Sequence, residues 1–76
     1  MFSLVRKNMQ KRYQIVTDNH SDGGFDEKSD HYHMNDAVNA AKKYMNEGYE
    51  GVGIYDIISG KWKHFYGNFR TEELFR

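Results

Sequence analysis

The stretch 35–66, NDAVNAAKKYMNEGYEGVGIYDIISGKWKHFY, constrains the fold most, because its pattern predicts a helix, a glycine stop and a β-hairpin. Asn35 suits the helix N-cap, and Asp36 follows it at the positive end of the helix. Apolar residues then recur at the spacing of an amphipathic helix, at Ala37, Val38, Ala41, Tyr44 and Met45. Gly48 suits the left-handed conformation that ends a helix.

The hairpin is predicted as strand 51–58, a two-residue turn at Ser59-Gly60 and strand 61–66. That turn pairs Ile57 with Trp62 and Tyr55 with His64. Alternation of side chains then places Val52, Ile54, Phe65 and the Asp56–Lys63 pair on one sheet face, and Ile57, Tyr55, Trp62, His64 and Tyr66 on the other. Both faces are apolar, and one helix covers only one of them.

The remaining segments complete a small α+β domain. The segment 11–17, KRYQIVT, predicts a strand, which we expect to lie parallel to strand 51–58 through a right-handed crossover. The segment 18–34 predicts a polar loop, and a short irregular strand near 31–34 is the alternative. We therefore expect one domain over 1–76 in the order β-α-β-β, with one main helix on one face of the sheet. The sheet is expected to have three strands, and the alternative is a sheet with a fourth, short strand.

The two ends of the chain carry separate expectations. Residues 1–10 are either an arm or extension, with Met9 as an alternative start, or a short element packed on the core. The segment 71–74, TEEL, predicts a final helical turn that Phe69 and Phe75 would hold against the domain. This tail is a candidate cover for the second sheet face.

Composition excludes several classes of function. The formal net charge is +0, so no global field favours nucleic acid or a membrane. The chain has no Cys, and no apolar run approaches the ~18 residues of a membrane span. With no signal-peptide pattern, we expect a cytoplasmic protein. No Ser lies in a nucleophile motif and no glycine loop suits a phosphate, so we predict a non-enzyme with no cofactor and no small-molecule substrate.

Three groups of residues are candidate sites. Aromatic and imidazole side chains of the hairpin predict a surface for a protein partner or for self-association, as a homodimer, at Tyr55, Trp62, His64 and Tyr66. The alternative is nucleic-acid binding by these aromatics and a basic N-terminal arm, Arg6, Lys7, Lys11 and Arg12. A second alternative is a weak metal site at His31 and His33. The bland interpretation is that the tail and the arm simply cover the aromatic face.

The helix–strand junction follows a spaced pattern of small, aromatic and aliphatic residues, Ala37, Ala40, Ala41, Gly48, Tyr49, Val52, Ile54 and Tyr55. This pattern resembles one in short uncharacterised proteins of Gram-positive bacteria and of their phages and mobile elements. The resemblance covers less than half of the chain and implies a small accessory protein of a host or phage genome. It implies no known activity. One form of the predicted partner-binding module is an inhibitor that occupies a host protein through the aromatic face.

Overall fold

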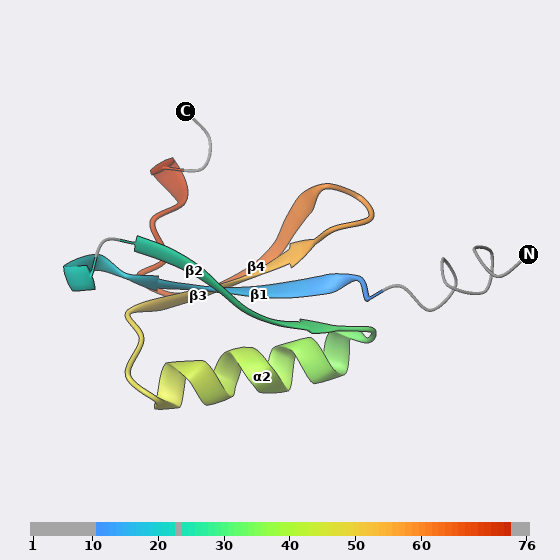
Figure 1. The fold of residues 1–76 in the computed structure, drawn as a ribbon, viewed down its shortest axis with the longest axis horizontal. Helices are drawn as coiled ribbons and strands as arrows, with labels where there is room; N and C mark the ends of the chain where they lie inside the picture. The colour runs from blue at the N-terminus through green and yellow to red at the C-terminus, as the bar shows by residue number, and fades with distance from the viewer. Residues whose placement is uncertain (1–10, 23, 74–76) are drawn as a thin grey trace, which may run out of the picture.

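The computed structural model describes residues 11–22 and 24–73. The elements are β1 (Tyr13–Asn19), a 3-10 turn (His20–Asp22), β2 (Gly24–His31), α2 (Met34–Asn46), β3 (Gly51–Asp56), β4 (Lys61–Gly67) and a second 3-10 turn (Thr71–Glu73). The strands form one antiparallel sheet in the order β2-β1-β3-β4. Figure 1 shows α2 along one face of this sheet and the C-terminal turn on the other side. The predicted α+β class with one main helix is confirmed.

The fourth strand, β2, lies inside the segment that the sequence predicts to be a loop. Its eight residues, Gly24–His31, pair with β1 along one edge of the sheet, so the element order is β-β-α-β-β. The polar composition of β2 fits an edge position, where backbone hydrogen bonds to one neighbour hold a strand whose side chains remain in water. A bulge opposite Ile15 and Val16 leaves Lys28 without a register partner.

The expected parallel pairing of the strands in 11–17 and 51–58 is wrong, because β1 and β3 are antiparallel. The cause is β2, which reverses the chain direction before the helix begins. The crossover through α2 therefore joins β2 to β3, and these two strands run parallel to each other on either side of β1.

The core lies between α2 and the sheet. It consists of fully buried aliphatic side chains, Ile15, Ala37, Ala41, Val52 and Ile54. Gly48 ends the helix as predicted, with a φ of 104°. The predicted N-cap at Asn35 is wrong: the helix begins at Met34, and His33 is the N-cap residue, without a side-chain cap hydrogen bond.

The hairpin between β3 and β4 differs from the predicted one in turn and register. β3 ends at Asp56, and the turn spans 57–60 in place of two residues. The Asp56 carboxylate accepts hydrogen bonds from the backbone N–H of Ile58 (3.1 Å) and of Ser59 (3.3 Å), which stabilises the longer turn. Tyr55 consequently pairs with Trp62, and a bulge follows. Relative to the predicted register, the bulge moves the β4 side chains that follow it, from His64 onward, to the opposite face.

Candidate binding face

The sheet face turned away from α2, here called the open face, carries a connected group of aromatic rings. Trp62 lies at its centre, with ring centroids 5.0 Å from Tyr55, 5.6 Å from Phe65 and 5.3 Å from Phe69. Phe69 also contacts Phe25 and Phe65, each at 5.2 Å. Offset and edge-to-face contacts at these separations are favourable for aromatic rings. The rings come from β2, β3, β4 and the tail, so the group forms only when the whole sheet is assembled.

The tail after β4 covers part of the open face. Phe69 is only 7% exposed and lies over Gly53 of β3. A Cβ atom at Gly53 would lie 2.8 Å from the Trp62 ring and 3.0 Å from the Phe69 ring, so only glycine leaves room for both. The prediction that Phe69 holds a C-terminal turn against the domain agrees with this packing, whereas Phe75 lies outside the described residues.

A buried ion pair fastens the tail to β1. The Arg70 guanidinium donates to the fully buried Asp18 carboxylate at 2.7 Å and 3.1 Å, and the Arg70 backbone N–H donates to it at 2.9 Å. Burial tends to raise the pKa of Asp18, but the hydrogen bonds from Arg70 outweigh it and hold that pKa below its usual value. His20 adds a further link, with its Nε2 atom 2.9 Å from the Asn68 carbonyl oxygen.

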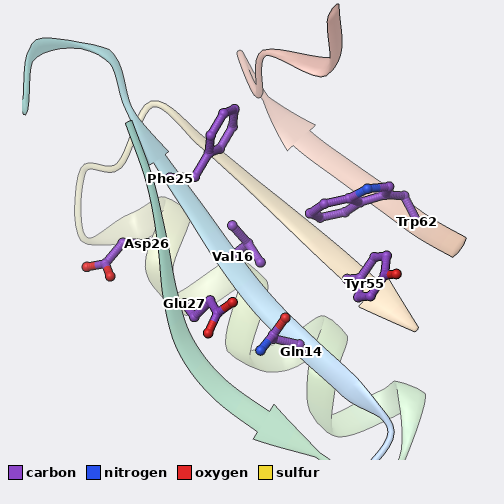
Figure 2. A pocket seen from close by; sticks show the side chains of 7 residues that line it. All are labelled: Gln14, Val16, Phe25, Asp26, Glu27, Tyr55 and Trp62. Carbon is purple, nitrogen blue, oxygen red and sulfur yellow. The ribbon is translucent and has the colours of Figure 1, made fainter. Parts of the chain in front are cut away.

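The part of the open face that the tail leaves uncovered is a shallow groove of about 530 Å³. It is lined by Gln14, Val16, Phe25, Asp26, Glu27, Tyr55 and Trp62. Figure 2 shows Tyr55 and Trp62 on the β3–β4 side and Glu27 on the β2 side, with Val16 and Gln14 between them on β1. The groove therefore has an aromatic wall, an acidic wall and a floor that is partly apolar.

Comparison with known proteins assigns no family. No family model, curated protein or solved structure gives a significant match to this chain. Within the described residues, no helix has the length and the apolar character that a membrane span requires. The geometry of the open face is therefore the feature that indicates a function.

The structure divides the four residues that the sequence groups as a partner surface. Tyr55 and Trp62 lie together on the open face and line the groove. The placement of His64 and Tyr66 on the same face is wrong, because Tyr66 packs against the core under α2 and the His64 ring lies beside it at 6.3 Å. The bulge in the β3–β4 pairing, which skips Lys63, is the physical reason.

Sequence reasoning missed Phe25, Phe65 and Glu27 as members of this face. Phe25 and Glu27 belong to the stretch that the sequence predicts to be a loop, and Phe65 falls on the helix side in the predicted register. The alternation of Phe25 and Glu27 within GFDE is a weak strand signal that the surrounding Asp, Ser and Gly residues obscure.

The predicted basic site is only partly described. Arg6 and Lys7 lie outside the described residues. The Arg12 guanidinium is bound to the Asp56 carboxylate, and the Lys11 ammonium lies 5.7 Å from the centroid of the Tyr32 ring. Both described cations therefore have partners within the domain.

The two histidines of the predicted metal site lie at the end of β2 and at the start of α2. His31 ends β2, and its Nε2 atom lies 2.9 Å from the Ser29 hydroxyl oxygen. His33 is the N-cap residue of α2. Within residues 11–22 and 24–73, no group of three His, Asp or Glu side chains is placed to hold a metal ion.

Proposed function

We propose that this chain is a small, non-enzymatic binding module that engages a protein partner through the open face. The observation that carries the proposal is the groove beside Trp62, whose aromatic wall is fixed on two paired strands and is only partly covered. Phe25 and Phe65 are 39% and 40% exposed at its margin. Tyr, Trp and Phe are enriched at the centres of protein interfaces, where large rigid side chains bury much area at low entropic cost.

The rigid placement of the rings supports binding. Trp62 contacts Tyr55, Phe65 and Phe69, so its ring has little freedom to lose when a partner covers it. Preorganised side chains of this kind lower the entropic cost of association. A shallow groove on a sheet suits a short segment of a partner better than an enclosed small molecule.

A protein partner fits the groove better than nucleic acid does. Glu27 lines it on the β2 side (Figure 2), and its carboxylate would repel a phosphate backbone. The chain resembles short proteins of bacteria, phages and mobile elements. We therefore propose that it acts as a small accessory protein that binds a protein of the host cytoplasm. A second copy of the chain is the other candidate partner.

The experiment compares open-face variants with a matched surface control. Phe65→Ser and Phe25→Ser each remove an exposed ring from the open face, whereas Ile58→Ser removes an exposed apolar side chain from the hairpin turn. Light scattering after size exclusion measures self-association, and selection of displayed random peptides on the immobilised protein measures binding in trans. We expect a dimer, or selected peptides, that both open-face variants weaken and Ile58→Ser does not. A monomer whose selected peptides bind all three variants equally would overturn the proposal.

A further inference from the structure

We propose that the open face selects a basic segment of its protein partner, with an Arg or Lys side chain seated between the aromatic wall and the carboxylates of β2. This inference rests on the proposed function and names the chemistry of the partner. It follows from the charges that the β2 bulge brings to the groove and from the absence of Lys and Arg among the described residues that line it. A contact of the same kind within the domain supports it as well.

The β2 bulge places two carboxylates on the open face. Val16 and Gln14 line the groove, and their register partners on β2 are Glu27 and Asp30. Cross-strand partners share a face, so Glu27 and Asp30 both project to the open side. The bulge at Lys28 makes this possible, because without the extra residue a three-residue spacing would put them on opposite faces. A smaller hollow of about 190 Å³ shares Gln14 and Glu27 with the groove and extends to Asp30.

Lys28 follows Glu27 in the chain and also lines the smaller hollow, but its ammonium is bound to a different carboxylate. The Lys28 ammonium lies 2.9 Å from an Asp26 carboxylate oxygen and 5.1 Å from the centroid of the Tyr49 ring. Asp26 is the principal cause of the raised pKa of Lys28. Among the described residues that line the groove there is no Lys or Arg, and no described side chain forms an ion pair with Glu27. The groove therefore presents unpaired negative charge facing an aromatic wall.

A cation above an aromatic ring and beside a carboxylate already occurs on this face. The Arg70 guanidinium lies 5.4 Å from the centroid of the Phe25 ring while it is bound to Asp18. A partner's Arg or Lys would find the same two elements in the groove, with Trp62 or Tyr55 as the ring and Glu27 as the carboxylate. The aliphatic stem of that side chain would cover the apolar floor at Val16.

The dimensions of the groove indicate an extended segment. Its lining runs along β1 from Gln14 to the level of Phe25, which pairs with Asp18. The four residue steps along β1 from Gln14 to Asp18 span about 13 Å. The groove is therefore long enough for about four residues of an extended peptide. Two side chains of such a peptide point to the same side, so one can reach Glu27 and the other Asp30.

The test uses the single tryptophan, Trp62, as a reporter inside the groove. Random 12-residue peptides displayed on phage are selected on the full chain, and the recovered peptides are synthesised with Arg and with its neutral isostere citrulline. We expect recovered peptides to carry Arg or Lys and to change Trp62 fluorescence. Replacing Arg by citrulline in the peptide, or Glu27→Gln in the protein, should raise the Kd by about tenfold. This is the effect expected from the loss of one charge-assisted contact.

Two controls separate this inference from the proposed function. Glu47→Gln removes an exposed carboxylate next to α2 and should leave the Kd unchanged. Combining citrulline with Glu27→Gln should add little to either change alone, because both remove the same contact. Peptides that need Phe65 but bind equally well to Glu27→Gln would overturn the basic-segment inference and leave the binding face standing. Failure to recover any peptide that depends on Phe65 would overturn the basic-segment inference, and together with a monomer in light scattering it would overturn the proposed function as well.

Discussion

Arg12 and Asp56, 44 residues apart in the chain, form a two-point ion pair that joins the start of β1 to the end of β3. The guanidinium donates through Nε at 3.0 Å and through Nη2 at 2.8 Å to the two oxygens of a fully buried carboxylate. The Arg12 carbonyl oxygen also accepts a hydrogen bond from the Ile57 N–H at 2.8 Å. At the opposite end of β1, Asp18 binds Arg70 of the tail, so each end of β1 is held by one Arg–Asp contact to a distant segment of the chain.

Replacing Arg12 should destabilise the domain, because Asp56 would remain buried without its counter-charge. We expect Arg12→Gln to lower the Tm by about 5–10 °C for a domain of this size. Arg12→Lys should recover only part of the loss, since an ammonium cannot make the two-point contact. Calorimetry measures the Tm, with Lys11→Gln as the control at the neighbouring position. Equal Tm values for Arg12→Gln and this control would contradict the prediction.

Stability should fall in acid because Asp18 and Asp56 have pKa values below their usual value. For Asp56 the main cause is the hydrogen bond from Arg12. A carboxylate with a lowered folded-state pKa contributes its full stabilisation above the unfolded-state pKa of about 3.9. The contribution is lost as the pH falls from there toward the folded-state pKa, because the unfolded chain binds more protons. The free energy of unfolding should therefore decrease steeply below about pH 4.

Urea titrations between pH 2 and pH 7 measure this dependence, and Asp56→Asn supplies the comparison. The variant is less stable at neutral pH, and its free energy of unfolding should vary less with pH because one of the two titrating groups is gone. An unchanged slope in Asp56→Asn would show that other carboxylates cause the acid loss.

Gly53→Ala should disturb the open face directly. Its Cβ atom would lie 2.8 Å from the Trp62 ring, so the ring must move or the strands must separate. We expect a loss of about 1–3 kcal/mol in the free energy of unfolding, as for other overpacked sites, and a shift in Trp62 fluorescence. Gly60→Ala is the control, since its positive φ strains the turn while the nearest atom, the Tyr55 hydroxyl, is at 3.7 Å. That variant should lose stability without a Trp62 shift; a shift of equal size in both would contradict the assignment.

Phe69→Ala should release the tail and enlarge the open face. The ring is nearly fully buried against Trp62, Phe65 and Phe25, and its removal should cost about 3 kcal/mol. Phe65→Ala, which removes a ring that is far more exposed, should cost less. Urea unfolding measures both variants, and binding of a hydrophobic dye to the folded protein should increase in Phe69→Ala. If Phe65→Ala proves the more destabilising of the two, the tail is not the anchor of the open face.

Prediction from the sequence succeeds where the signal is local. The helix follows from the 3.6-residue spacing of Ala37 and Ala41 with their neighbours, and its end follows from Gly48. The N-cap of α2 lies two residues before the predicted Asn35, because the chain leaves β2 through His33, which becomes the N-cap by its position. A preference for a capping side chain is small beside the packing that fixes where the helix begins.

Prediction fails where backbone pairing across the sheet decides the outcome. The composition of GFDEKSDH does not strongly favour a strand. This segment forms β2 because its backbone pairs with that of β1. The prediction of the candidate site is affected most, because a one-residue difference in register moves every following side chain to the other face. The β3–β4 bulge therefore separates Tyr66 from Trp62 and brings Phe65 to the open face.

The sequence by itself determined that this chain has one amphipathic helix, a glycine stop, a β-hairpin and more apolar sheet surface than one helix can cover. Those properties depend on residues that are neighbours along the chain. Only the tertiary structure decided the order of the strands, the two bulges, the cover that Phe69 provides and the placement of Glu27 and Trp62 around one groove. These depend on hydrogen bonds and contacts between distant segments, which form when the four strands pair and which no local spacing specifies.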